Sequence, residues 1–370
     1  MKKVGIVTFY GVNYGSALQV YALQKKVQEL GYKVSVIDYK NTKKYYGKIV
    51  RVMTLLNRYI GMKRAGISTE LTKSKAQYSC RTAEIFEEFY SRYIEFSDDN
   101  YLNPQKYDAF IAGSDQIWGI NIPGLHYVYY LRFTSKKKRI AYAPSFGGNE
   151  VPKYNTKKLA TYLKGMRHIS VREKSGVDIV DYSINKHVLQ VVDPTLLVGR
   201  TFWDDLLSNI ETDKVGIFCY FLDDTSLGYN VIEQLKKDSK FDVWWTEIGT
   251  KCNNPSYVQK NLSPFEFVNA IRNAKYVVTD SYHAMLFSIL FSKDFYVVER
   301  NYQRNNSQAD RIISMLELLK IENRYIKNLE DVSMALDGKM YDTEQVDKII
   351  SEKRRESEQY LKMSLANVCK

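Results

Sequence analysis

Cysteine is scarce in this chain, and the spacing of the cysteines argues against both a disulfide-stabilised fold and a zinc-stabilised fold. The 370 residues include four cysteines, with no CxxC pair and no zinc-finger spacing among Cys80, Cys219, Cys252 and Cys369. The sequence therefore predicts neither a disulfide framework nor a metal site, and it fits a reducing compartment. With 7 prolines and 45% hydrophobic residues, the chain is long enough for two ordinary globular domains.

Long apolar runs are also missing. No stretch approaches the ~20 apolar residues that a transmembrane helix needs, and the apolar run of the amino-terminal MKKVGIVTFYG is too short for a signal peptide. We therefore expect a cytoplasmic protein, with a position at the inner face of the membrane as the alternative.

Acidic residues are outnumbered, since the chain has 54 Lys and Arg against 42 Asp and Glu and a formal net charge of +12. This balance favours an acidic partner, which leaves nucleic acid, anionic lipid and a phosphorylated small molecule open. No helix-turn-helix, zinc-finger or RNP pattern is present to recognise bases, so we expect no nucleic-acid partner.

Apolar strand patterns alternate with helical patterns along the chain. The first unit is a strand over 3–9, a helix over 16–30 capped by Ser16, and a strand over 33–38. Further strands are predicted at 107–112, 139–143 and 169–172, and a second series at 188–192, 215–221, 242–247, 276–279 and 295–298. This alternation is typical of an α/β fold with parallel sheets. We place the joint between residues 193 and 213, which gives predicted domains of 1–200 and 201–370.

The segment 275–292, KYVVTDSYHAMLFSILFS, carries one of only four histidines at a strand-to-helix turn. The strand stops at Asp280, and an apolar helix begins beside His283. Backbone N–H groups and the positive end of the helix dipole favour an anion at such a turn. We expect His283 to lie in an exposed loop at the strand end. The alternative is a histidine that only satisfies a nearby backbone group.

Two loops of the first domain follow predicted strands, at the sheet edge where open α/β sheets bind ligands. In the first loop, Asn13, Tyr14 and Gly15 allow the backbone to approach a ligand closely, although a structural turn explains them equally well. The second loop is GSDQIW, in which the candidates to hold sugar hydroxyls or take a proton are Ser114, Asp115 and Gln116.

A third loop contains Arg172, which leaves a predicted strand and enters a helix. An arginine placed there can clamp a carboxylate or phosphate through two parallel hydrogen bonds. A surface pair between Arg172 and Glu173 is the alternative.

In this order, these loops and the His283 turn resemble the polysaccharide pyruvyl transferase family. The matching segments are NYGSALQVYAL (13–23), AGSDQIW (112–118), YAPSFG (142–147), SVREKSG (170–176), VDPTLL (192–197), TDSYHAMLFSILF (279–291) and ADRIISMLELLKIENR (309–324). The resemblance implies two Rossmann-like domains in a glycosyltransferase-B-like (GT-B-like) arrangement with an interdomain cleft. The first domain would be the acceptor side, and the second, with a C-terminal helix, the donor side.

The resemblance also implies a reaction. Members of the family transfer pyruvate from phosphoenolpyruvate to two hydroxyls of a sugar as a cyclic ketal, on a bacterial surface glycan such as a capsule or exopolysaccharide, or on its lipid-linked precursor. That chemistry requires no metal or redox cofactor. By this resemblance Arg172 would hold the carboxylate and phosphate of the donor, and His283 would supply a proton. Asp115 would position or deprotonate the acceptor hydroxyl.

One position departs from the family pattern. Relatives often carry an arginine two residues before the motif histidine, where this chain has Ser281. We expect Ser281 and Tyr282 to contact substrate, and a different arginine to supply the missing anion ligand. The candidates are Arg300, Arg304 and Arg311.

The segment 40–64 has eight Lys and Arg and no acidic residue, interleaved with apolar side chains. This pattern predicts an interfacial helix on an anionic membrane, which would bring the enzyme to a lipid-linked acceptor. A structural cap of the first domain is the alternative.

Two other functions stay open at this point. A glycosyltransferase that uses a nucleotide sugar would share the two-domain cleft, and competition by phosphoenolpyruvate rather than by a nucleoside diphosphate separates the two. A non-catalytic glycan-binding protein would tolerate the loss of His283.

Overall fold

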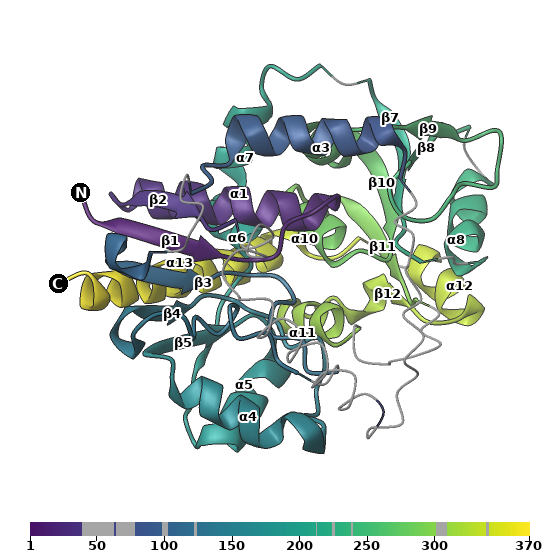
Figure 1. The fold of residues 1–370 in the computed structure, drawn as a ribbon. Helices are drawn as coiled ribbons and strands as arrows, with labels where there is room; N and C mark the ends of the chain where they lie inside the picture. Colours follow the sequence, from purple (N-terminus) through teal and green to yellow (C-terminus); the bar gives the residue numbers. More distant parts are fainter. Residues whose placement is uncertain are drawn as a thin grey trace.

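The computed structural model describes residues 1–38, 63, 78–97, 103–121, 124–211, 213–223, 226–237, 240–300, 309–337 and 340–370. Within them the chain forms two parallel six-stranded sheets, each flanked by helices (Figure 1). Strand and helix alternate in both halves, as in Rossmann-like domains. The predicted α/β fold class is therefore confirmed.

The first sheet has the strand order β2-β1-β3-β4-β5-β6. Its strands are β1 (Lys3–Val7), β2 (Lys33–Val36), β3 (Ala109–Ala112), β4 (Arg139–Ala141), β5 (His168–Val171) and β6 (Leu189–Gln190). Its helices are α1 (Tyr14–Glu29), α3 (Cys80–Tyr93), α4 (Lys153–Lys164) and α5 (Lys174–Ile184), with 3-10 turns η2 (Pro104–Lys106) and η3 (Lys136–Lys138). The strand predicted at 188–192 in the second series is β6, which pairs with β5 and completes the first sheet.

The second sheet has the order β12-β11-β10-β7-β8-β9. Its strands are β7 (Val215–Tyr220), β8 (Val243–Thr246), β9 (Val258–Lys260), β10 (Ala274–Thr279), β11 (Asp294–Val298) and β12 (Tyr325–Ile326). Its helices are α8 (Ser226–Lys236), α9 (Pro264–Asn273), α10 (Tyr282–Leu290), α11 (Asp310–Leu319) and α12 (Leu329–Asp337), with the 3-10 turn η4 (Glu322–Arg324). The edge strands β9 and β12 were not predicted, because two or three paired residues carry no readable alternation.

The connection between the sheets runs through α6 (Pro194–Leu197) and α7 (Gly199–Leu207). The last helix, α13 (Thr343–Val368), returns to the first sheet. There the Tyr360 hydroxyl donates to the Ala141 carbonyl at 2.9 Å, and the Ser357 hydroxyl accepts from the Val192 N–H at 3.0 Å. The division into 1–200 and 201–370 stays a prediction.

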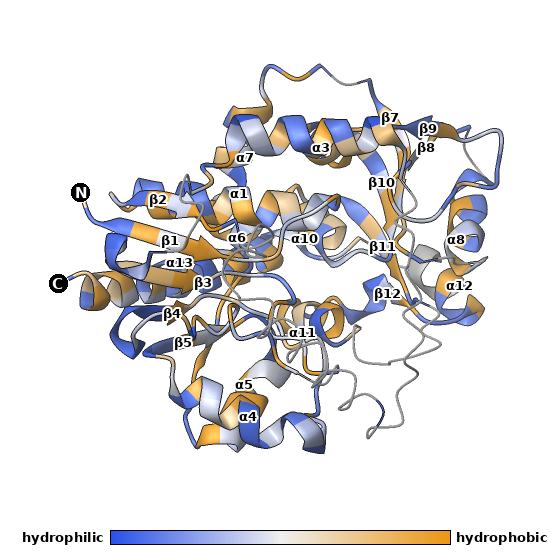
Figure 2. Cartoon of the chain, in the orientation of Figure 1, coloured by the Kyte–Doolittle hydropathy of each residue, from blue (hydrophilic) through white to orange (hydrophobic). Residues whose placement is uncertain are grey.

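One apolar core runs through both domains. Helix α6 contacts both α1 and α10, and a single buried cluster includes Tyr14, Trp203, Phe267 and Phe287. The rings of Tyr14 and Phe267 stack with 4.1 Å between their centroids, a contact that contributes about 1 kcal/mol beyond burial. Figure 2 shows apolar residues along the strands and polar residues on the outer sides of helices. The two domains are therefore closed against each other.

Helix α1 begins earlier than predicted, at Tyr14. Asn13 has an extended backbone, and its side chain accepts a hydrogen bond from the Ser16 N–H at 3.1 Å. Asn13 rather than Ser16 is therefore the N-cap, a role that both residue types fill well. The earlier start brings Gly15 into the first helical turn.

Membrane and metal features were also sought in the structure. Within the described ranges, no helix combines the length and the apolar character that crossing a membrane requires. The same part of the chain holds no group of three or more His, Cys, Asp or Glu placed to bind a metal ion. The basic segment 40–64 lies outside the described residues, apart from residue 63.

Candidate active site

The turn after β10 is buried, not exposed as predicted. Ser281 is the N-cap of α10, and its hydroxyl accepts from the Ala284 N–H at 3.5 Å. Asp280 is fully buried and His283 is only 6% exposed. The reason is that the first domain covers this turn, where Gly15 and Asp193 contact the imidazole of His283.

Asp193, which the sequence did not single out, lies at the centre of the site. It is fully buried after β6, and its Oδ1 accepts from the N–H and hydroxyl of Thr195 at 3.0 and 2.9 Å. Its Oδ2 accepts hydrogen bonds from Ser114 Oγ and Arg172 Nη1, both at 2.8 Å. The same oxygen lies 3.5 Å from His283 Nε2. Asp193 therefore joins two loops of the first domain to the histidine of the second.

Arg172 is also fully buried, and three carboxylates surround it. Besides its bond to Asp193, its Nη2 lies 3.8 Å from Asp115 Oδ1 and its Nε lies 4.0 Å from Glu173 Oε2. The ring of Tyr282 lies 4.6 Å from the guanidinium carbon, a cation–π contact. The predicted contact between Arg172 and Glu173 is present, but both side chains are buried, so it is not a surface pair.

The charges in this cluster are mutually dependent. Burial alone would raise the pKa of Asp193, but the neighbouring His283 and Arg172 hold that pKa well below its usual value. Burial alone would lower the pKa of Arg172, but Tyr282 and Asp193 raise it above its ordinary value. Burial raises the pKa of Glu173, which Arg172 partly offsets. At neutral pH, Asp193 is therefore a fixed negative charge beside the imidazole.

Asp115 and Gln116 lie at the half-buried edge of this cluster. Asp115 has a φ of 72°, which is uncommon for any residue but glycine, and its Oδ1 accepts from the Gln116 N–H at 2.8 Å. The amide of Gln116 lies against Gly147, where a Cβ atom would fall 1.6 Å from Gln116 Nε2. The strained turn thus holds the Asp115 carboxylate beside Arg172.

Asn13 and Tyr14 contact residues of the second domain. Asn13 Nδ2 lies 3.4 Å from the Tyr220 hydroxyl, and the Tyr14 hydroxyl donates to the Leu262 carbonyl at 3.0 Å. Tyr14 is fully buried. Contact of either residue with substrate stays a prediction.

Two of the three candidate arginines lie at the His283 turn. Arg300 Nε lies 3.0 Å from Asp280 Oδ2, and the guanidinium also donates to the Asp280 carbonyl. The guanidinium carbon of Arg311 lies 5.6 Å from the ring centre of Tyr282. Arg304 lies outside the described residues.

A sequence signal for Asp193 exists but was interpreted as part of the domain joint. An acidic residue followed by proline directly after a strand marks a helix start, and it also places a carboxylate at the edge of the sheet where Arg172 ends β5. No comparable signal exists for Glu173, because its burial depends on the loop around Phe146, whose N–H donates to Glu173 Oε1 at 2.7 Å.

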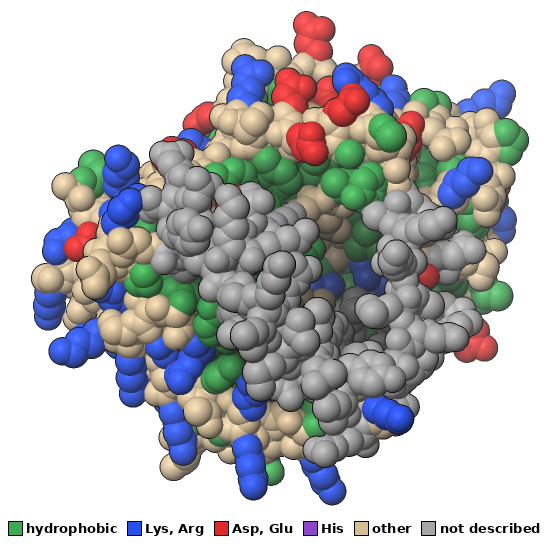
Figure 3. Space-filling model, viewed as in Figure 1, with side chains coloured by type: hydrophobic (Ala, Val, Ile, Leu, Met, Phe, Trp, Pro, Cys, Tyr) green, Lys and Arg blue, Asp and Glu red, His purple; other side chains and the backbone are tan. Residues whose placement is uncertain are grey.

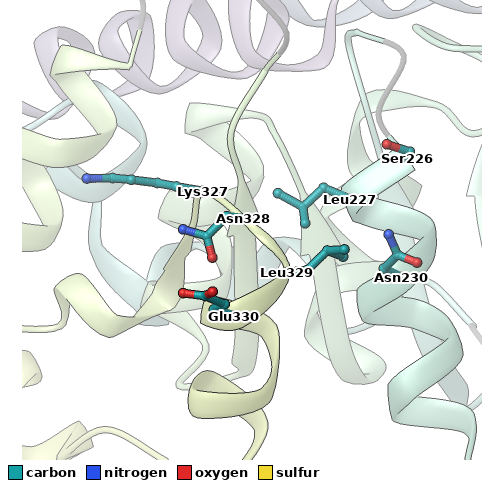
Figure 4. A pocket seen from close by; sticks show the side chains of 7 residues that line it. All are labelled: Ser226, Leu227, Asn230, Lys327, Asn328, Leu329 and Glu330. Atoms are coloured by element: carbon teal, nitrogen blue, oxygen red, sulfur yellow. The ribbon is translucent and has the colours of Figure 1, made fainter.

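The surface offers a hollow and a separate cavity. Figure 3 shows a hollow in the middle of one face, with hydrophobic side chains on its upper wall and Lys and Arg side chains on its floor. A cavity of about 630 Å³ lies between the first residues of α8 and α12 (Figure 4) and is lined by Ser226, Leu227, Asn230, Lys327, Asn328, Leu329 and Glu330. None of these residues belongs to the Asp193 cluster. We place the candidate active site at the cluster, because there a buried arginine and buried carboxylates of the first domain meet the motif histidine of the second.

The fold is similar to that of several solved structures. UDP-GlcNAc 2-epimerase from Neisseria meningitidis matches with a TM-score of 0.51 at 10% identity, over 99% of this chain and 100% of that chain. UDP-N-acetylglucosamine 2-epimerase from Rickettsia bellii matches with a TM-score of 0.51 at 11% identity, over 100% of this chain and 97% of that chain. UGT89C1 from Arabidopsis thaliana matches with a TM-score of 0.51 at 12% identity, over 100% of this chain and 99% of that chain. At these identities the likeness shows the fold alone, and it confirms the GT-B-like arrangement.

Sequence comparison gives the family. Among curated proteins, no sequence matches this chain. A family model described as polysaccharide pyruvyl transferase matches residues 13–302, a range that contains Asp115, Arg172, Asp193 and His283. Because the match covers well over half of the sequence, the chain belongs to the polysaccharide pyruvyl transferase family.

Proposed function

We propose that this chain transfers pyruvate from phosphoenolpyruvate onto two hydroxyls of a glycan sugar, forming a cyclic ketal in the synthesis of a bacterial surface polysaccharide. Membership of the family implies an enzyme. The observation that carries the proposal is the buried cluster in which Asp193 joins Arg172 of one domain to His283 of the other. A fixed charge beside a titratable imidazole suits a reaction that needs a proton and expels phosphate.

His283 is the proposed proton donor. Ketal formation requires a proton on the methylene carbon of phosphoenolpyruvate, attack of an acceptor hydroxyl at C2, loss of phosphate and closure by the second hydroxyl. The Asp193 carboxylate, 3.5 Å from His283 Nε2, is placed to orient the ring. Asp193 is thus a positioning residue in this proposal, and His283 the general acid.

The remaining residues divide between the two substrates. Asp115, at the half-buried edge, accepts the proton of the acceptor hydroxyl, with Gln116 beside it. Arg172, Arg300 and Arg311 near the turn, together with the N–H groups at the start of α10, are the proposed partners of the donor carboxylate and phosphate. Because Gly15 covers His283, donor entry requires α1 and α10 to separate.

The test uses phosphoenolpyruvate with a panel of synthetic and lipid-linked glycosides. We expect phosphate release that depends on the acceptor, together with a pyruvyl mass increase on it. A nucleotide-sugar enzyme of the same fold would respond to nucleoside diphosphate instead. Turnover of a nucleotide sugar, with no response to phosphoenolpyruvate, would overturn the proposal.

Gly15→Ala is expected to reduce transfer on the order of 100-fold. A Cβ at Gly15 would fall 2.1 Å from His283 Nδ1, so the imidazole must move away from Asp193 or the domains must separate. The matched control is Gly119→Ala, where the nearest atom lies 3.7 Å from the added Cβ. Initial rates and thermal unfolding of both variants give the comparison. Equal activity of the two would show that the close contact is not needed.

Arg172→Lys is expected to harm transfer almost as much as Arg172→Ala. The guanidinium bonds to Asp193 and faces Asp115 and Glu173 along its other edge, whereas an ammonium cannot meet three carboxylates at once. Breaking a buried pair typically costs about 3–5 kcal/mol of stability, so denaturant unfolding should detect both variants. A Lys variant with near-normal stability and near-normal apparent affinity for phosphoenolpyruvate would contradict this role.

A further inference from the structure

Cations concentrate on one part of the first domain. Residues 132–168 contain ten Lys and Arg and one acidic residue, Glu150. The ten are Arg132, Lys136, Lys137, Lys138, Arg139, Lys153, Lys157, Lys158, Lys164 and Arg167. Among the described residues, none of these cations forms an ion pair with a carboxylate, in contrast to the exposed pair of Lys174 and Asp178 on the next helix. This segment and the segment 40–64 are both strongly cationic, and acidic residues elsewhere in the chain partly offset them.

Helix α4 presents its lysines away from the core. Asn155, Leu159 and Leu163 are its buried residues, and the 3.6-residue period puts Lys153, Lys157 and Lys164 together on the opposite, exposed side. We call these three lysines, with the exposed Lys136, Lys137, Lys158 and Arg167 around them, the basic face. In the view of Figure 3, Lys and Arg side chains project along the lower edge, where Figure 1 places α4, and acidic side chains gather at the upper edge over α3.

The cations of this region are crowded together. Arg132 and Lys158 both lie over the ring of Tyr162, at 5.3 and 5.5 Å from its centre. At the end of α4, a Cβ on Gly165 would fall 2.3 Å from Arg132 Nη1 and 2.9 Å from Arg139 Nη1. Such crowding without carboxylates costs electrostatic free energy in the isolated protein, and an anionic partner would recover it.

The charge placement also opposes the stability of α4. The helix begins with Lys153 beside its positive dipole end, has no acidic residue in its first turn, and has no side-chain cap at Pro152. Glu or Asp at these positions would stabilise the helix. The lysines are therefore better explained by something they bind than by the helix they belong to.

Hydrogen bonds connect α4 to the loop that follows β3. The hydroxyl of Tyr154, which is 39% exposed beside the lysines, donates to the Asn121 carbonyl at 2.9 Å. The buried Asn155 side chain donates to the Ile120 carbonyl at 2.7 Å. Both carbonyls belong to the loop after β3 that carries Asp115. Helix α4 is therefore attached to the same loop as the proposed acceptor-side residue.

From these observations we infer that the basic face is a docking surface for an anionic lipid bilayer. It is a convex helix side with long flexible lysines and an amphipathic tyrosine, which suits a flat layer of phosphate headgroups. A duplex nucleic acid is disfavoured, because six of the seven cations of the basic face are lysines and only Arg167 could form bidentate contacts with phosphate or guanine. This inference goes beyond the proposed transfer reaction and does not depend on it, because lipid binding is measured without turnover.

The experiment is co-sedimentation of the full chain with vesicles of phosphatidylglycerol and phosphatidylcholine, and with phosphatidylcholine alone, at low and high salt. We expect recovery with the anionic vesicles only, reversed by salt. The test variant is Lys153→Gln/Lys157→Gln/Lys164→Gln, which should weaken partitioning on the order of 100-fold if each lysine contributes as typical surface cations do.

The matched control removes the same charge from the second domain, in Lys237→Gln/Lys240→Gln/Lys251→Gln, at three exposed positions. This control should bind vesicles like the wild type and unfold at the same temperature as it. The α4 variant should unfold at the same or a higher temperature, because it loses a cation at the positive end of the helix dipole. A further variant, with Lys43, Lys44, Lys48 and Arg51 changed to Gln, tests the segment 40–64 separately.

Three results would overturn the inference. The first is equal recovery of the wild type on anionic and neutral vesicles. The second is undiminished binding by the α4 variant, above all if the 40–64 variant loses binding. The third is a salt-sensitive shift of random-sequence duplex DNA without vesicle binding, which would assign the basic face to nucleic acid.

Discussion

Asp193→Asn is expected to abolish detectable transfer, with a loss of at least about 10²–10⁴-fold, although asparagine keeps the shape of the side chain. The substitution removes the charge that holds Arg172 at 2.8 Å and faces His283 at 3.5 Å. It leaves a buried guanidinium with weaker compensation, so unfolding should also become easier by about 3–5 kcal/mol. Initial rates of phosphate release and urea unfolding measure the two effects.

The control for Asp193 is Asp178→Asn. Asp178 pairs with Lys174 at 2.8 Å, but both side chains are 65% exposed, and exposed pairs of this kind contribute little. The Asp178→Asn variant should therefore be close to the wild type in both the rate of phosphate release and the urea unfolding. If the Asp193→Asn variant kept a rate within a few fold of the wild type, Asp193 would have no role in the reaction and would be a purely structural residue.

His283→Asn is expected to lower transfer by about 10²–10⁴-fold while leaving the fold intact. The imidazole is buried between Gly15 and Asp193, and asparagine fills part of its volume while removing the Nε2 atom that faces the Asp193 carboxylate. His283→Ala should lose the same activity and more stability, because it leaves a cavity.

His168→Asn serves as the control for His283, since His168 lies at the start of β5, at the opposite end of the strand from Arg172. Its transfer rate should match the wild type. If His283→Asn retained a rate within a few fold of the wild type, proton donation by His283 would be excluded.

The positions of the site residues followed from the sequence, but their partners did not. The rule that parallel strands end at a common edge placed Arg172 and Asp115 close together, and the family resemblance added His283 of the second domain. The structure brings all three within one cluster. Asp193 completes that cluster from a connection whose turn was interpreted as a domain joint. Strand periodicity cannot indicate which carboxylate an arginine will bond, because that choice depends on packing between loops distant in sequence.

Burial of the site was also not predictable from local pattern. An isolated strand-to-helix turn is exposed, and His283 becomes buried only because α1 packs on α10 across the domain interface. Gly15 was predicted to allow close approach of a ligand, and in the structure it allows close approach of the His283 ring. Tyr14 was a candidate for substrate contact, but its partners are Leu262 and Phe267, whose proximity no local signal encodes.

The most direct test of the account is transfer in deuterated water with phosphoenolpyruvate and an acceptor glycoside. If a proton from the enzyme reaches the methylene carbon, the new ketal methyl group will carry solvent deuterium, and phosphate will appear in equal amount. Both products should be lost together in His283→Asn and in Asp193→Asn, but not in Asp178→Asn. Transfer of a sugar from a nucleotide donor, or ketal formation at the wild-type rate in His283→Asn, would contradict the account.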